Sequence, residues 1–335
     1  MNDAQQKPPT SDRPGLLRNL RLSPPLAALI LAIVLFLLSG LLPNGFNNAT
    51  QAARQAINIL RLSAFLGMIA AGQTLIIISG GDGIDLSAGA VVTLSAILTF
   101  SIVNGQNLMT IPGLLLALGV GAAIGFVNGV GIAILRISPL VMTLSMAGVV
   151  EGLILVTTQG VLTGATAPIM NAVINRPLVF GIPGVIFIWA LFGLAIWLLL
   201  ERTPFGKQLF GIGVNRITAR LSGVRVPAMV ILTYTLGSML AAFGGFMLLG
   251  FTGMVFINLG TPYLFPSIAA VAVGGTLLSG GKGSYFGTMA GAIVLTLLTS
   301  LLTTMQIPDA FRQMILGGTL LLLISIYGRQ RALRQ

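Results

Sequence analysis

The sequence predicts an all-α protein that crosses a lipid bilayer several times. Of its 335 residues, 55% are hydrophobic and only 7% are charged, whereas soluble domains carry about 25% charged residues. Apolar runs of about 20 residues, the length of a membrane-spanning helix, follow one another along most of the chain. Backbone polar groups in lipid must be paired within the chain, so such runs are expected to be helices.

We expect about ten spans in a single transmembrane domain, 24–328, between tails at 1–23 and 329–335. The predicted spans are 24–42, 62–79, 88–104, 112–135, 138–158, 182–200, 227–250, 265–280, 286–304 and 312–328. The first run resembles a signal peptide, but no small-x-small cleavage site follows it, so we expect it to be retained. An amphipathic interfacial helix is expected to lead into the second span, and a structured cap at 159–181.

Basic residues are distributed unevenly between the two ends of these spans. With the N-terminus inside, most of the 18 lysines and arginines fall on inner segments, and the exceptions are Arg54, Arg61, Arg176 and Arg312. This asymmetry predicts that both termini are cytoplasmic. It also explains the net charge of +11 without nucleic acid as a partner, because the charges form no basic stripe.

The composition argues against an enzyme. The chain has no cysteine, no histidine and only seven carboxylates, which excludes thiol nucleophiles, disulfides, Cys/His metal sites and histidine bases. We expect no catalytic residue and no metal site. The glycine-rich stretch 280–283 is not a phosphate-binding loop, because Thr276 and Gly283 stand where that motif needs glycine and Ser/Thr. Energy must therefore come from another chain or from a gradient.

The longest polar stretch, 201–226, holds five basic residues and a single acid, Glu201. Apolar residues recur in it at helical spacing, which predicts a short amphipathic helix at the membrane surface, directed at a soluble partner. The alternative is a basic loop that only sets the topology and binds anionic lipid.

A second motif, 80–87, joins the second and third predicted spans and contains Gly81, Asp85 and Ser87. Glycines allow the reversal, and Asp85 and Ser87 are expected to cap the next helix. The sequence SGGDG at 79–83 also matches SGGKG at 279–283. Either an internal repeat or the chance recurrence of glycine-rich turns explains this match.

Polar residues also lie inside predicted spans. Glu151 is expected to act as a proton-coupling carboxylate, as a ligand for a sugar hydroxyl, or only in a helix–helix hydrogen bond. Small polar residues either line a path for a hydroxylated substrate or pack helices together. The candidates for the path are Gln73, Thr74, Asn128, Thr143 and Glu151.

Three ordered motifs carry a family resemblance: GIDLSAG at 83–89, ISPLVMTL at 137–144, and the stretch from TPFG at 203–206 to ARLSGV at 219–224. They resemble permease subunits of bacterial sugar-type ATP-binding-cassette (ABC) importers, the ribose, xylose, galactose and autoinducer-2 group. The resemblance covers about 45–328. The chain departs from it in the extra Asp82-Gly83 and in Glu151, where relatives commonly carry a basic residue.

The resemblance implies a permease subunit in the bacterial inner membrane that moves a sugar or sugar-like solute by alternating access. It implies three kinds of partner: a second permease subunit, identical or paralogous, ABC ATPase subunits that bind ATP and Mg, and a periplasmic binding protein. A helix at 215–223 would dock in the ATPase. The implied coupling residues are Asn215, Arg216, Ala219, Arg220, Ser222 and Gly223.

Other functions stay open at this point. An ion- or proton-coupled secondary transporter would use Glu151 or Asp85 as its coupling carboxylate and would need no ATPase. A membrane-embedded enzyme would need a catalytic constellation that the scattered carboxylates do not provide. Within the ABC class, a nucleoside or branched-chain amino acid permease is the alternative to a sugar permease.

Overall fold

A computed structural model describes residues 23–42, 45–179, 181–315, 317–319 and 321. Within them the fold is all-α, apart from a small antiparallel hairpin of β1 (Pro177–Val179) and β2 (Ile182–Pro183). The predicted tails at 1–23 and 329–335 lie outside the described residues, except for Ser23.

The helices follow the predicted apolar runs closely. They are α1 (Pro24–Gly40), α2 (Ala49–Ile78), α3 (Ala88–Val103), η1 (Asn107–Met109), α4 (Thr110–Ala133), α5 (Pro139–Thr158), α6 (Pro168–Asn175), α7 (Gly184–Arg202), α8 (Pro204–Val214), α9 (Arg216–Leu221), α10 (Val226–Thr252), η2 (Thr261–Tyr263), α11 (Leu264–Val273) and α12 (Tyr285–Thr304). The chain is helical again from Asp309, so the predicted span 312–328 is described only in its first part.

Six helical segments of the described chain are long and apolar enough to cross a membrane: α2, α4 with η1, α5, α7, α10 and α12. The protein is therefore a multi-pass membrane protein. Three further apolar helices, α1, α3 and η2 with α11, are shorter. The count of about ten spans and the direction of the termini stay predictions. The short eighth span is broken, since α11 ends at Val273 and a loop follows to Ser284.

The predicted interfacial helix is not separate from the second span. Both form one continuous helix, α2, of 30 residues. At 1.5 Å per residue this helix is about 45 Å long, more than the roughly 30 Å hydrocarbon core of a bilayer. Its polar first turns therefore extend beyond the apolar layer.

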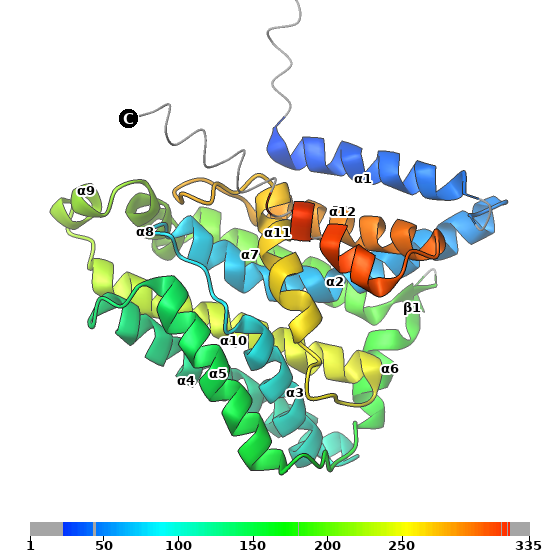
Figure 1. Ribbon diagram of the computed structural model, residues 1–335, viewed down its shortest axis with the longest axis horizontal. Coiled ribbons are helices and arrows are strands. Elements are labelled where there is room, and N and C mark those ends of the chain that lie inside the picture. Colours follow the sequence, from blue (N-terminus) through cyan, green and yellow to red (C-terminus); the bar gives the residue numbers. More distant parts are fainter. Residues whose placement is uncertain (1–22, 43–44, 180, 316, 320, 322–335) are drawn as a thin grey trace, which may run out of the picture.

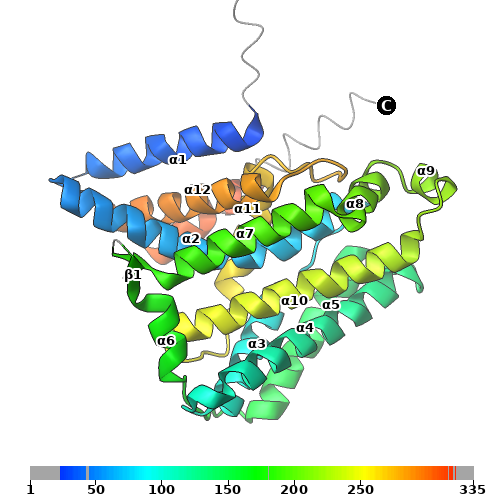
Figure 2. The same cartoon turned by 180° about the vertical axis from the view of Figure 1, so that it is seen from behind.

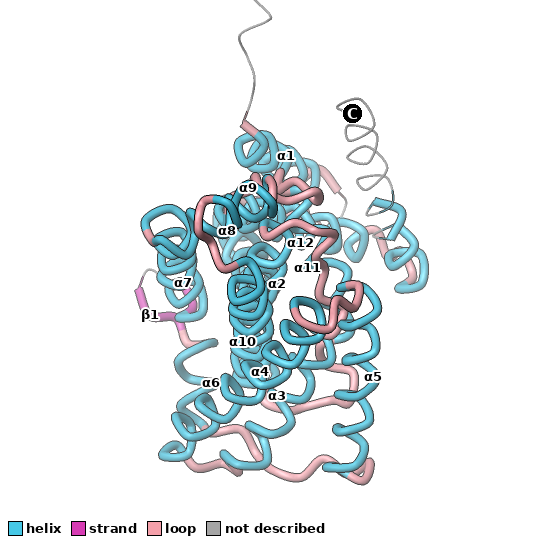
Figure 3. Tube along the Cα trace, turned by 90° about the vertical axis from the view of Figure 1, so that its left-hand side faces the viewer, coloured by secondary structure: helices cyan, strands magenta, loops and turns pink. Residues whose placement is uncertain are grey.

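Helices α2 and α10 run side by side through the centre of the molecule, and α5 and α7 lie on opposite sides of them (Figure 3). Glycines permit this close approach: a Cβ on Gly72 of α2 would overlap the carbonyl oxygen of Gly237 of α10. In the most apolar stretch of each helix, 89% of the residues of α2 are buried, but only 22% of those of α4 and of α5. The two outer helices therefore present most of their surface to lipid or to another protein.

The molecule has two distinct ends (Figures 1 and 2). One, which we call the α9 end, carries α8, α9, the α4–α5 junction and the loop 274–284. The other, the hairpin end, carries α6 and the β1–β2 hairpin, which form the structured cap predicted at 159–181. The described basic residues at the α9 end are Arg136, Arg202, Lys207, Arg216, Arg220, Arg225 and Lys282, and those at the hairpin end are Arg54, Arg61, Arg176 and Arg312.

Candidate functional site

The polar stretch 201–226 folds into two short helices, each with its own cap. The side chain of Thr203 accepts a hydrogen bond from the Gly206 N–H at the start of α8. Asn215 opens α9 by accepting from the N–H groups of Ile217 (2.8 Å) and Thr218 (3.1 Å). Side-chain caps of this kind satisfy free N–H groups at a helix start. The helix predicted at 215–223 is therefore present, as α9, and its docking role stays a prediction.

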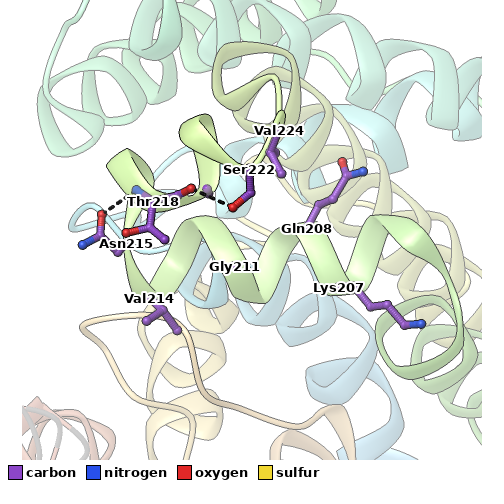
Figure 4. A pocket seen from close by; sticks show the side chains of 9 residues that line it. Lys207, Gln208, Gly211, Val214, Asn215, Thr218, Ser222 and Val224 are labelled. Atoms are coloured by element: carbon purple, nitrogen blue, oxygen red, sulfur yellow. Dashed lines mark hydrogen bonds between the residues drawn. The ribbon is translucent and has the colours of Figure 1, made fainter.

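Helix α9 presents apolar side chains to the outside. Ile217 is 74% exposed and Leu221 84%, one turn apart, and Val214 just before the helix is 72% exposed. Between α8 and α9 lies an open hollow of about 590 Å³ (Figure 4). It is lined by Lys207, Gln208, Gly211, Val214, Asn215, Thr218, Ala219, Ser222 and Val224. A hollow beside exposed apolar residues can receive part of another protein.

The six coupling residues implied by the family resemblance separate into two groups. Four are exposed at the α9 end: Asn215, Arg220, Ser222 and Gly223. The other two point inward. Ala219 is buried, and the Nη2 atom of Arg216 donates to the carbonyl oxygen of Gly80, 136 residues earlier in the chain, at 3.1 Å. No local pattern in the sequence indicates this contact.

Three backbone segments meet beside Arg216 in what we call the glycine junction: Gly80, Gly213 and the pair Gly280–Gly281. Added Cβ atoms on Gly80, Gly213 and Gly280 would meet backbone of a partner segment at van der Waals contact or closer. The Gly281 N–H donates to the Ile78 carbonyl oxygen at 2.9 Å. Only glycine fits such close backbone crossings.

The two matching stretches, 79–83 and 279–283, thus lie against each other. Both glycine pairs also adopt the same left-handed conformation, with φ of 69° and 68° at Gly80–Gly81 and of 87° and 75° at Gly280–Gly281. The match in sequence is therefore also a match in backbone conformation. Whether it is the trace of a duplication stays a prediction.

Beyond the junction, the segment 80–87 folds back along α2 into the interior instead of forming a tight surface turn. Its backbone is paired by side chains. Gln73 donates to the Asp85 carbonyl oxygen (2.6 Å) and accepts from the Asp85 N–H (3.3 Å). Thr143 Oγ1 accepts from the Leu86 N–H at 3.1 Å. Non-helical backbone at membrane depth is tolerated only where such partners exist.

The Asp85 carboxylate lies at the centre of a buried polar group, which we call the Asp85 cluster. Oδ1 accepts from the N–H (2.8 Å) and hydroxyl (2.5 Å) of Ser87, and Oδ2 accepts from Ser238 at 3.2 Å. Asn128 donates to Ser87 Oγ at 3.0 Å. The prediction that Ser87 caps α3 is wrong, because its hydroxyl donates to Asp85 and accepts from Asn128 and makes no cap bond. Asp85 does accept from a backbone N–H at the start of α3, that of the N-cap residue Ser87.

Sequence reasoning missed two members of this region, both on α10. Ser238 bonds directly to Asp85, and Tyr234 is 1% exposed, with a hydroxyl that has no hydrogen-bond partner in the described part of the chain. No sequence feature distinguishes these two residues from the many other hydroxyl residues in the spans that only pack helices together. Their three-dimensional proximity to a carboxylate gives them their importance.

The candidate path residues fall into an enclosed set and one exposed residue. Gln73, Thr74, Asn128 and Thr143 are all 0–1% exposed, and Thr74 bonds to Thr288 at 2.8 Å. In this conformation these four are enclosed and bonded within the chain.

Glu151, by contrast, is exposed on α5. The inward face of α5 holds Thr143, Val150 and Ile154. On the outward face, a Cβ on Gly148 or Gly152 would meet nothing within 4 Å. Within the described ranges, no group of three or more His, Cys, Asp or Glu side chains could hold a metal ion.

The sequence matches a known protein family. The sequence model of the family described as branched-chain amino acid transport system / permease component matches residues 55–324. The chain belongs to this family. No solved structure matches the chain.

Curated relatives extend over almost the whole chain. The Ribose import permease protein RbsC of Escherichia coli (strain K12) is 34% identical over 298 residues, 88% of this chain and 89% of the relative. RbsC of Bacillus subtilis (strain 168) is 33% identical over 314 residues, 93% and 94% of the two chains. The Autoinducer 2 import system permease protein LsrC of Escherichia coli O9:H4 is 31% identical, over 91% and 87%. The resemblance inferred from the motifs is confirmed.

Proposed function

We propose that this chain is the membrane-spanning permease subunit of an ATP-driven importer that brings a sugar or sugar-like solute across the bacterial inner membrane. The observation that carries the proposal is the α8–α9 unit, which is capped, basic and exposed at one end of a chain whose relatives are import permeases. The chain is a transport subunit. ATP and Mg²⁺ bind to a separate ATPase, and a periplasmic binding protein delivers the solute.

In this proposal α9 is the docking element for the ATPase. Ile217 and Leu221 lie four residues apart and are 74% and 84% exposed, so they form one apolar ridge, and Arg220 is exposed on the same short helix. Apolar anchors beside a basic side chain fit a groove that is apolar inside and acidic at its rim. Anionic lipid alone would explain the charge but not the exposed ridge. The excess of basic residues at the α9 end supports a cytoplasmic position for it in this proposal.

A second permease subunit, identical or paralogous, covers the outward face of α5 in the proposed complex. A carboxylate on a lipid-facing surface is costly, so Glu151 is expected to face protein or water instead. Gly148 and Gly152 leave an open strip on which another helix can approach closely. The translocation route then runs between the two subunits, with Glu151 on its wall.

The proposal is tested by reconstituting the chain in liposomes with its cognate ATPase and binding protein, using radiolabelled D-ribose as the probe. Loaded binding protein should stimulate ATP hydrolysis and drive uptake. Arg220→Glu should lower the stimulated rate at least about tenfold, equivalent to 1.4 kcal/mol, because it reverses the charge at the docking helix. Arg220→Lys, which keeps the positive charge on the docking helix, is the matched control and should keep most of the wild-type rate.

Two results would contradict this function. Equal rates for Arg220→Glu and wild type, with equal amounts of inserted protein, would remove α9 from coupling. Uptake without any ATPase, lost when an ion gradient is collapsed, would show a secondary transporter, with Glu151 as the coupling carboxylate to pursue.

A further inference from the structure

The two arginines of α9 are placed for different tasks. Arg220 is exposed to a partner, whereas Arg216 is half-buried and turned back into the chain. Its Nη2 atom donates to the Gly80 carbonyl oxygen at 3.1 Å. A Cβ on Gly81 would lie 2.5 Å from the guanidinium carbon, so the side chain is packed tightly against this turn. Arg216 therefore contacts backbone, and any shift of α9 acts on a whole segment of chain.

That segment leads directly into the interior. Five residues after Gly80 comes Asp85, which is 1% exposed and bonded to Ser87 and Ser238. Through Gln73, Asn128, Thr143 and Ser238, the segment and its cluster contact α2, α4, α5 and α10. The turn beside Arg216 is thus continuous with a polar region that joins these four helices.

The region between Arg216 and Asp85 is incompletely paired. Arg216 Nε, the Tyr234 hydroxyl and Asn128 Oδ1 are buried polar atoms without hydrogen-bond partners among the described residues. Tyr234 lies near both Asp85 and Arg216. Buried polar atoms without partners are costly and rare. A second arrangement of this region that pairs these atoms would therefore be favoured.

We propose that Arg216 is a positioning residue that ties α9 to the 80–87 segment, so that movement of α9 displaces this segment and rearranges the Asp85 cluster. The inference rests on the proposed function, in which an ATPase moves α9. It assigns different roles to two neighbouring arginines: Arg220 binds the ATPase, and Arg216 transmits the movement within the chain.

The test separates docking from transmission in the reconstituted complex with D-ribose as the probe. For each variant we would measure the Kd of the ATPase for the chain and the number of D-ribose molecules imported per ATP hydrolysed. Arg216→Gln should keep the Kd within about twofold but lower the transport ratio at least about tenfold. Arg220→Gln should weaken the Kd with the ratio unchanged. Arg216→Lys should restore part of the ratio, because an ammonium N–H can still donate to Gly80.

A second variant approaches the same contact from the other side. Gly81→Ala places a methyl group where the Arg216 guanidinium lies and should lower the transport ratio as Arg216→Gln does. Gly81 has φ of +68°, so alanine is also strained there. Gly160→Ala, with φ of +78° and nothing within 4 Å, is the matched strain control and should keep the wild-type ratio.

The outcomes are distinguishable. Wild-type protein without ATP-driven uptake would overturn the proposed function and this inference with it. Wild-type uptake together with a normal ratio in Arg216→Gln would overturn the inference alone. So would an Arg216→Gln variant that loses ATPase affinity in parallel with Arg220→Gln, because Arg216 would then be a docking residue.

Discussion

Two of the described carboxylates, Asp85 and Glu151, lie in opposite surroundings. Asp85 is 1% exposed and accepts hydrogen bonds from Ser87 and Ser238. Glu151 is exposed on an otherwise uncharged helix, beside glycines with open space around them. The Asp85 carboxylate finds its hydrogen-bond donors within the chain. The other requires something from outside it.

This difference changes what a polar residue in a predicted span means. Gln73 and Thr143 are candidates for a substrate path in sequence, but in the structure they bind the unwound backbone of 84–87. Breaking a helix at membrane depth exposes N–H and C=O groups that lipid cannot satisfy, so nearby side chains must do so. Glu151 binds no such backbone among the described residues, and it remains the candidate to meet water, solute or a second subunit.

The largest effect on stability is expected from Gln73→Leu. The change leaves the N–H and C=O of Asp85 buried without partners, at about 1–3 kcal/mol each, so the variant should lose about 2–6 kcal/mol. Thermal unfolding in detergent should show an apparent Tm at least about 5 °C lower. Gln106→Leu, at an exposed loop position, is the control. Equal unfolding temperatures would mean that the interior segment does not depend on Gln73.

A smaller effect on stability is expected from alanine substitutions at two glycines of α8, one packed against backbone and one open. In α8, a Cβ on Gly213 would overlap the Ile78 carbonyl oxygen, whereas one on Gly211 would meet nothing within 4 Å. Gly213→Ala should therefore cost about 1–3 kcal/mol through overpacking. Gly211→Ala should stabilise the protein by about 0.5–1 kcal/mol, because alanine favours the helix. The same unfolding measurement compares them, and an unchanged Gly213→Ala variant would argue against the glycine junction.

The smallest effect on stability is expected from Glu151→Gln. The same variant should transport much less solute. Because the side chain has no role inside the chain, unfolding should change by less than about 0.5 kcal/mol. Uptake should fall at least about tenfold, since a hydrogen bond to a charged group is worth about 1.5–3 kcal/mol. Leu153→Ala, at another exposed position of α5, is the control for uptake. Wild-type transport in Glu151→Gln would place the route elsewhere.

Much of the fold could be predicted from local patterns. The apolar runs located α1, α3, α4, α5, α7, α10 and α12 to within a few residues, and the polar stretch 201–226 indicated a short helix that is present as α9. The family motifs indicated a permease, and the relatives confirm it. These features are local in sequence, because length and polarity alone decide whether a segment can sit in lipid.

What the sequence determined by itself is therefore the class of protein, the course of its helices and the position of its exposed basic end. The tertiary structure decided which polar groups meet. It brought Gly80 to Arg216, Ser238 to Asp85 and Gly281 to Ile78, across 136, 153 and 203 residues between the contacting groups. No local periodicity encodes such pairs. They form because buried backbone and carboxyl groups must find partners, and only the packed helices determine which partners are within reach.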